Sequence, residues 1–247
     1  MSMLGIIGGT GLDSLDGLDV ELRQTASTPW GVPSAPLLYG RLAGHEVTFL
    51  ARHGGEHAIA PHEVNYRANV WALREAGVDR VIAVNAVGGI NDEFAPGMLA
   101  VPDQLIDYSW GRAHSFCGAG GQPLQHVDFT VPYSQSMRAE LLAAAARAGL
   151  AVRDGGVYAV TQGPRLETAA EVDRLARDGC HVVGMTGMPE AGLARELGLE
   201  YACCAVIVNR AAGRGSDIHG ELARWVEQGM AAARRLLHAV IDAPGSA

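Results

Sequence analysis

The sequence has 247 residues, of which 48% are hydrophobic and 19% are charged, and it carries a formal net charge of −8 at pH 7. That composition excludes a disordered or collagen-like chain and provides enough apolar surface for one sizeable core. No 18-residue apolar run is present, so no membrane-spanning helix is expected, and the acidic balance lacks the basic stripe that polynucleotide binding requires. A small anion can still bind, because a local pocket is decided by geometry rather than by net charge.

The compartment is predicted from the amino terminus and the cysteines. The first apolar run, Leu4–Ile7, is too short for the core of a secretory signal and is followed at once by two glycines. Cys117, Cys180, Cys203 and Cys204 form no CxxC pair, which favours reduced, packed thiols over a disulfide framework. Cys203 and Cys204 are adjacent in a predicted strand and should point to opposite faces. We therefore expect a cytoplasmic protein.

Apolar runs and helical spacing alternate along the chain. Runs rich in β-branched residues predict strands at Leu4–Ile7, Val47–Leu50, Val81–Val84, Val157–Thr161, His181–Met185 and Ala202–Asn209. Helical spacing predicts helices at Val64–Ala76, Ser136–Ala148, Ala169–Arg177, Pro189–Leu197 and Glu221–Val240. Strands that alternate with helices indicate an α/β fold. We assign residues 1–242 to a single domain and residues 243–247 to a C-terminal tail.

The first two predicted strands end in residues suited to holding an anion. The first runs into a turn, Gly8–Gly11, whose glycines allow close backbone approach, and the Thr10 hydroxyl adds a donor. The second ends at Arg52 and His53, where a guanidinium can clamp a phosphate with two hydrogen bonds. A plain tight turn, a surface arginine and a packing histidine are the alternatives. Ligands bind beyond the carboxyl ends of strands in open α/β sheets, so both groups should meet at one site.

The third predicted strand, Val81–Val84, is followed by the small residues of 85–89. We expect this stretch to be a turn that presents the Ala86 N–H to the same anion. The glycine-rich turn after the first strand does not favour a dinucleotide cofactor, because the GxGxxG spacing and a following acidic strand end are missing. A nicotinamide-dependent oxidoreductase is the alternative that NADH binding would test.

Four segments carry a resemblance to a known family: Gly5–Asp13, Leu50–Gly54, Val64–Leu73 and Met185–Glu190. Over about the whole chain, the sequence resembles the methylthioadenosine phosphorylases of the trimeric purine nucleoside phosphorylase superfamily. The resemblance implies a central mixed β-sheet flanked by helices, and phosphorolysis of a nucleoside at C1′. It further implies inorganic phosphate as co-substrate, no metal or organic cofactor, and a homotrimer.

The resemblance also assigns roles residue by residue. It places the phosphate against Thr10, Arg52, His53, Asn85, Ala86 and Thr186, and the ribose over Met185. The chemistry agrees, because positive charge forms on the ribosyl centre between a phosphate nucleophile and a departing purine. The site must therefore hold the phosphate, exclude water and stabilise the leaving base.

The predicted base site departs from the adenosine-type pattern at two positions. Methylthioadenosine phosphorylases usually carry an aspartate pair where this chain has Asn209, and a serine where it has Glu167. The Asn209 amide can donate to N7 or O6 of a 6-oxopurine, and Glu167 can accept the N1–H of hypoxanthine. Adenine has no proton at N1 and would face an unpaired carboxylate. Leu166 and Ala211 are expected beside the base; a solvated Glu167 and a strand-capping Asn209 are the alternative.

The 5′ substituent is predicted from the segment that opens the last helix. Ile218 and Leu222 would lie on one helix face and form an apolar cup for a methylthio group. His219 would favour a 5′-hydroxyl if it faces the ribose. His126 matches a histidine that a neighbouring subunit contributes in the family, and an ordinary loop histidine is the alternative. S-methyl-5′-thioinosine is the expected substrate, against S-methyl-5′-thioadenosine, inosine or guanosine, or a nucleoside sensor without turnover.

Overall fold

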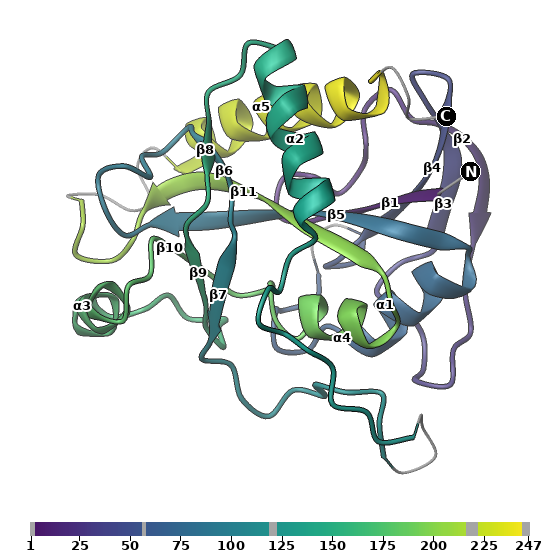
Figure 1. Cartoon of the computed structure of the whole chain (residues 1–247), viewed down its shortest axis with the longest axis horizontal. Coiled ribbons are helices and arrows are strands. Elements are labelled where there is room, and N and C mark those ends of the chain that lie inside the picture. Colours follow the sequence, from purple (N-terminus) through teal and green to yellow (C-terminus); the bar gives the residue numbers. More distant parts are fainter. Residues whose placement is uncertain (1–2, 56–57, 119–122, 216–221, 244–247) are drawn as a thin grey trace.

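The computed structural model describes residues 3–55, 58–118, 123–215 and 222–243, which form one α/β domain around a mixed sheet (Figure 1). The strands are β1 (Met3–Gly8), β2 (Asp19–Gln24), β3 (Leu37–Leu42), β4 (His45–Ala51), β5 (Val78–Gly89), β6 (Leu99–Val101), β7 (Gln104–Asp107), β8 (Val152–Asp154), β9 (Val157–Val160), β10 (Val182–Gly184) and β11 (Glu200–Arg210). The helices are α1 (Tyr66–Glu75), α2 (Gln135–Arg147), α3 (Ala169–Arg177), α4 (Glu190–Glu196) and α5 (Leu222–Ile241). Most of the predicted tail lies outside the described residues.

The sheet confirms the predicted fold class. Its main path runs β2-β3-β4-β1-β5-β10-β9-β7, and β11 pairs with both β5 and β6. β1 is parallel to β4 and β5, and β11 is parallel to β5, whereas β10 runs antiparallel to β5. The sheet is therefore mixed, and all six predicted strands lie in it.

The central strand β5 is interrupted along one edge. β11 pairs with β5 along one edge for nearly its whole length. Along the other edge, β1 pairs as far as Ala83, and β10 begins only at Gly88. Residues 84–87 therefore face a gap between the end of β1 and the start of β10.

The prediction of a turn at residues 85–89 is wrong, because β5 continues through Gly89. The small residues there allow close packing on both faces of a buried strand rather than a reversal of the chain, and Asn85 itself is fully buried. Five strands were also missed: β2, β3, β6, β7 and β8. β6, β7 and β8 have only three or four residues, too few for a pattern to stand out. β2 does alternate, with apolar Val20 and Leu22 between polar residues, and this signal was overlooked.

Helices cover both faces of the sheet (Figure 1). On one face, α1 and α4 pack into a core that includes Leu73, Leu193 and Cys203. On the other, α2 and α5 pack into a second core with Leu141 and Cys204. The two adjacent cysteines thus point to opposite faces, as strand geometry predicted. α3 lies apart and contributes to a third, smaller cluster.

Side-chain caps fix where the predicted helices begin. The Asn65 side chain accepts a hydrogen bond from the Ala68 N–H, so α1 starts two residues later than predicted. Thr168 and Glu171 form a reciprocal capping box at the start of α3, which begins at the predicted residue. This box ends the loop that carries Glu167, one of the residues predicted to bind the base.

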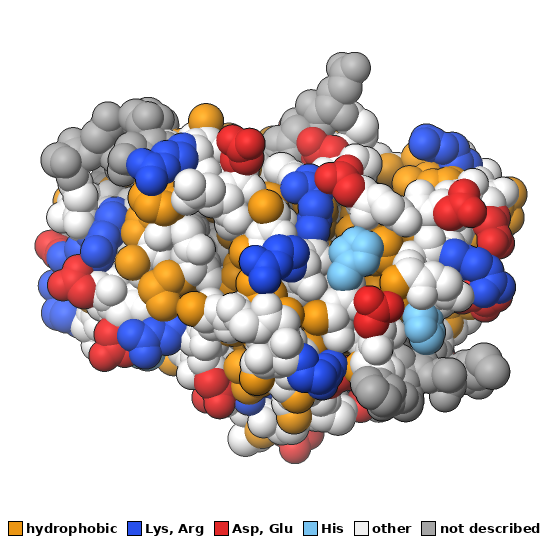
Figure 2. All heavy atoms as spheres, turned by 90° about the horizontal axis from the view of Figure 1, so that it is seen from above, with side chains coloured by type: hydrophobic (Ala, Val, Ile, Leu, Met, Phe, Trp, Pro, Cys, Tyr) orange, Lys and Arg blue, Asp and Glu red, His pale blue; other side chains and the backbone are white. Residues whose placement is uncertain are grey.

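Acidic and basic side chains are interspersed over the face seen in Figure 2, without a continuous basic stripe. Among the described helices, none is both long and apolar enough to cross a membrane.

Gly229 brings α5 close to β11, and we predict that its replacement destabilises the domain. A Cβ atom there would collide with Val206 Cγ1, and the stiff β-branched side chain cannot move away cheaply. Gly229→Ala should lower the free energy of unfolding by about 1–3 kcal/mol, although alanine is the better helix former. Urea denaturation measures this. Gln228→Ala, at the exposed neighbouring position, is the control, and equal stability of the two variants would contradict the packing argument.

Candidate functional site

A cavity of about 230 Å³ opens at the gap beside β5. It is lined by Gly9, Thr10, Arg52, His53, Pro61, Ala86, Val87, Gly88, Leu166, Glu167, Val183, Gly184, Met185, Thr186, Val208, Asn209, Ala211, Ala212, Leu222 and Val226. These residues come from the ends of β1, β4, β10 and β11, from β5, from the segment before α3 and from α5. Eleven of the predicted site residues thus line one cavity: Thr10, Arg52, His53, Ala86, Leu166, Glu167, Met185, Thr186, Asn209, Ala211 and Leu222.

One end of the cavity is rich in hydrogen-bond donors. The Arg52 Nη1 donates to the Val84 carbonyl across 3.1 Å, inside the gap in the sheet. In a strand, amide groups two residues apart face the same edge, so the Ala86 N–H faces the gap as well. A Cβ at Gly9 would lie 2.7 Å from both Arg52 Nη1 and the Val84 oxygen. Gly9 therefore has to be glycine for these groups to come together.

Arg52 is fully buried and forms a two-point ion pair with Glu190 at the start of α4. Its Nε donates to Glu190 Oε2 at 2.8 Å, and its Nη2 donates to Oε1 at 3.0 Å. Tyr201 donates its hydroxyl to Oε1 at 2.8 Å, and burial raises the pKa of this phenol so that it stays protonated. Burial by itself would lower the pKa of Arg52, but the Glu190 charge and hydrogen bonds raise it overall. Each terminal guanidinium nitrogen keeps a second N–H for a ligand.

A second buried chain supports Thr186. The Cys203 thiol donates to Asn85 Oδ1 at 3.3 Å, and Asn85 Nδ2 donates to Thr186 Oγ1 at 2.8 Å. Because the Thr186 hydroxyl accepts from the amide, it can donate its own proton to an anion in the cavity. Asn85 does not line the cavity, so the structure gives it an indirect place behind Thr186 rather than direct contact.

His53 is almost fully buried and lines the same end. Its Nδ1 lies 2.8 Å from the Ile59 carbonyl. A carbonyl oxygen can only accept, so Nδ1 carries a proton in this arrangement. His53 then donates to an anion through Nε2 only when the imidazole is doubly protonated.

The residues predicted to read a base line the same cavity, and Asn209 pairs with Gly88, four residues along β5 from Val84. Glu167 lies in the segment between β9 and α3, residues 161–168, which we call the base loop. The Thr161 hydroxyl donates to Glu167 Oε1 at 2.6 Å, which leaves Oε2 for a ligand. Asn209 Nδ2 donates one hydrogen to the Arg210 carbonyl at 2.7 Å and keeps a second. A purine between them would meet one acceptor and one donor.

The segment between β10 and α4, residues 185–189, carries Met185 and Thr186. We call it the phosphate loop, after the role that the sequence predicts for Thr186. Leu222 and Val226, one turn apart on α5, line the cavity as an apolar patch. Val226 was not predicted; its i+4 spacing from Leu222 was the available signal. Ile218 and His219 lie outside the described residues. His126 is exposed and does not line this cavity.

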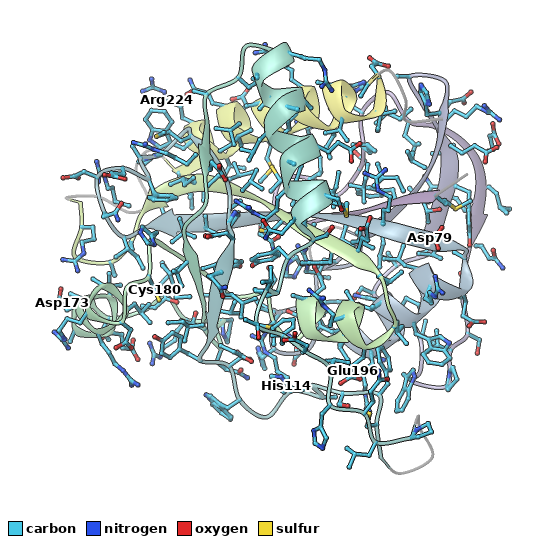
Figure 3. The ribbon with its side chains drawn as sticks, viewed as in Figure 1. Asp79, His114, Asp173, Cys180, Glu196 and Arg224 are labelled. Atoms are coloured by element: carbon cyan, nitrogen blue, oxygen red, sulfur yellow. The ribbon has the colours of Figure 1, made fainter. Side chains whose placement is uncertain are left out.

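A neighbouring cavity of about 320 Å³ shares Glu167 with the first and is lined by Tyr108, Trp110, Gln162, Arg165 and residues of α3. Figure 3 shows α3, with Asp173, at the periphery of the fold. In the part of the chain that the structure describes, no group of three or more His, Cys, Asp or Glu is arranged to hold a metal ion.

Comparisons with known proteins find relatives over nearly the whole chain. The model of the phosphorylase superfamily matches residues 3–242. The chain is 51% identical to a probable S-methyl-5′-thioinosine phosphorylase of Pseudomonas syringae pv. tomato, covering 98% of this chain and 100% of that protein. It is 42% identical to an S-methyl-5′-thioadenosine phosphorylase of Mycobacterium tuberculosis, covering 97% and 89%. The methylthioadenosine phosphorylase from Schistosoma mansoni in complex with tubercidin superposes with a TM-score of 0.92 at 30% identity, covering 98% and 90%.

We predict that Glu190→Gln strongly destabilises the protein, because it leaves the buried Arg52 charge without its counter-ion. The free energy of unfolding should fall by about 3 kcal/mol, measured by urea denaturation. The control is Asp79→Asn, at the start of β5 (Figure 3), which breaks the exposed ion pair between Asp79 and Arg74. That change should cost no more than about 1 kcal/mol. Equal losses in the two variants would show that the buried pair contributes no more to the free energy of unfolding than the exposed pair.

Proposed function

The chain belongs to the phosphorylase superfamily, and we propose that it cleaves S-methyl-5′-thioinosine with phosphate, giving hypoxanthine and S-methyl-5-thio-α-D-ribose 1-phosphate. The observation that carries this proposal is one cavity lined by Glu167 and Asn209 as well as by Arg52 and Thr186. Asn209 pairs with Gly88 on β5, whereas Arg52 contacts Val84, four residues back along the same strand. We propose that the ribose fills the space between a base held by Asn209 and Glu167 and a phosphate held by Arg52 and Thr186. The 51% identity to a probable thioinosine phosphorylase supports the same substrate.

The proposed phosphate site uses Thr10, Arg52, the Ala86 N–H and Thr186, with His53 beside them. These groups hold hydrogen phosphate under the ribose, next to C1′. A phosphate oxygen forms a bond to C1′ as the C1′–N9 bond breaks, and the electron pair of that bond leaves with the purine. Fixed donors in a site that excludes water favour this step, because they need no reorganisation as charge moves.

The leaving base is stabilised at the other end. Asn209 donates its remaining N–H to N7 or O6, where negative charge develops, and Glu167 Oε2 accepts the N1–H of hypoxanthine. In the overall balance, the proton of hydrogen phosphate ends on the purine. Glu167 and Asn209 therefore act as catalytic residues that also select a 6-oxopurine.

The 5′-methylthio group is placed against Leu222 and Val226. A thioether favours such an apolar surface, whereas a 5′-hydroxyl buried there would lose its hydrogen bonds to water. Ile218 belongs to the same proposed pocket by sequence. S-methyl-5′-thioadenosine phosphorylase activity is the second candidate, favoured by the fold match to the Schistosoma mansoni enzyme.

Initial rates test the proposal directly. S-methyl-5′-thioinosine, S-methyl-5′-thioadenosine and inosine are compared at equal concentration, with and without phosphate. We expect the first to be cleaved fastest and only when phosphate is present. A preference for the adenine nucleoside would overturn the base assignment, and a preference for inosine would overturn the apolar 5′ pocket.

Asn209→Asp is predicted to reduce the preference for hypoxanthine over adenine by at least about tenfold. The amide donor at N7 or O6 becomes a carboxyl group, which can accept from the adenine amino group. The ratio of kcat/KM for the two methylthio nucleosides is the measurement. Asn91→Asp, at an exposed position before β6, should leave the ratio unchanged; the same ratio in both variants would remove Asn209 from the base site.

The protein is further proposed to act as a cytoplasmic homotrimer in which His126 of one chain reaches a neighbouring site. Two apolar side chains support a covered surface here: Leu124 is 76% exposed in the single chain, and Trp110, beside the second cavity, is 70% exposed. Four unpaired cysteines suit a reducing compartment. Residues 1–242 are proposed as the folding unit.

Subunit complementation tests the role of His126. His126→Ala and Glu167→Gln are each expected to lose most activity as pure proteins. When they are unfolded together and refolded, the mixed oligomers should regain activity, because a site built on the His126→Ala chain receives an intact histidine from its neighbour. Light scattering gives the oligomeric state. A monomer, or mixtures that stay inactive while His126→Ala alone is impaired, would place His126 in its own chain.

A further inference from the structure

Arg112 lies across the two loops that carry the reactive groups, although the proposed chemistry gives it no contact with substrate. Its Nη1 donates to the carbonyls of Met185 at 2.8 Å and Met188 at 2.6 Å, both in the phosphate loop. Its Nη2 donates to the carbonyls of Thr161 at 3.2 Å and Gln162 at 2.8 Å, both in the base loop. One planar guanidinium therefore bridges the two loops.

Further contacts fix the orientation of the Arg112 guanidinium. Nε donates to the side-chain oxygen of Gln162 at 3.2 Å, and the guanidinium carbon lies 5.5 Å from the centre of the Tyr66 ring. Nη1 also donates to the Tyr66 hydroxyl oxygen at 3.4 Å. Within the described ranges, no carboxylate forms an ion pair with Arg112, and its other acceptors are carbonyl groups of the turning loops. Such carbonyls have no strand or helix partner and need one from elsewhere. Arg112 donates to several of these carbonyls at once.

We propose that Arg112 is a positioning residue that sets the spacing between Glu167, which binds the base, and Thr186, which binds phosphate. In the base loop, Thr161 gives its carbonyl to Arg112 and its hydroxyl to Glu167. In the phosphate loop, the Arg112 contact to Met185 lies one residue before Thr186. A shift of the guanidinium would move both ends of the bound nucleoside relative to phosphate.

Only arginine suits this position. Its two terminal nitrogens are held apart in one plane, so each can serve a different loop. A lysine keeps the charge but concentrates its donors on a single nitrogen, and it can hold one loop at a time. Arg112→Lys therefore separates the bridging geometry from the positive charge.

This inference rests on the proposed function, and the experiment keeps the two apart. For Arg112→Lys, we expect kcat/KM for S-methyl-5′-thioinosine to fall about 100-fold, as for a misplaced reacting group. The phosphate KM should rise, and the preference over the adenine nucleoside should shrink in the same variant. Thr161→Val, which removes only the hydroxyl that orients Glu167, should reduce the base preference and leave the phosphate KM unchanged.

Arg138→Lys is the matched control. Arg138 also caps backbone carbonyls, those of Val101 and Pro102, but on elements away from the cavity. Both arginine variants should lose stability, yet only Arg112→Lys should change the two KM values and the base preference. If it loses stability like Arg138→Lys and keeps wild-type kinetics per folded enzyme, the positioning role is wrong.

Binding measurements test the positioning role of Arg112 without relying on turnover. Calorimetry gives the Kd of hypoxanthine and of phosphate for wild type and for each variant. If wild type shows no phosphate-dependent cleavage, the proposed function fails. Weaker binding of both ligands to Arg112→Lys, but not to Arg138→Lys, would still support the bridge, and unchanged binding would overturn it.

Discussion

The ion pair between Arg52 and Glu190 is the interaction on which the rest of the site depends. Two charges removed from water cost several kcal/mol each, and they are tolerated here because the pair is bidentate and Tyr201 satisfies the carboxylate further. The pair links the end of β4 to the start of α4, and so fixes the point at which the phosphate loop ends. It also orients the guanidinium so that its remaining N–H groups can serve a ligand.

The interrupted edge of β5 explains why we propose a ligand site at this place. Backbone groups on a buried strand need partners, and between Ala83 and Gly88 neither β1 nor β10 supplies them. Arg52 takes the Val84 carbonyl, and the proposed phosphate takes the Ala86 N–H. The same gap separates the carboxyl ends of β1 and β10, and residues that follow both strands line the cavity there. The sheet topology and the ion pair thus together form the site in which the proposed chemistry takes place.

Much of the site could be predicted because its residues follow strands directly. Thr10, Arg52 and Thr186 each come just after an apolar run. The parallel strands β1 and β4 bring Thr10 and Arg52 to one edge, whereas Thr186 follows β10, which runs antiparallel to β5 and ends at the gap from the other side. The Glu190 partner of Arg52 could not be found this way, since 138 residues separate the two and no local pattern marks a buried long-range pair. Arg112 gave no signal either, because most of its acceptors are backbone carbonyls, which any residue has. The turn predicted at residues 85–89 was wrong because small residues are found in tight turns and in tightly packed strands alike.

The most direct test of this account is a crystal structure of the protein with phosphate and hypoxanthine bound together. The account predicts phosphate in the β5 gap, within hydrogen-bond distance of Arg52, the Ala86 N–H and Thr186, and hypoxanthine with N1 toward Glu167 and N7 or O6 toward Asn209. Phosphate bound elsewhere, or a base turned away from both side chains, would contradict it.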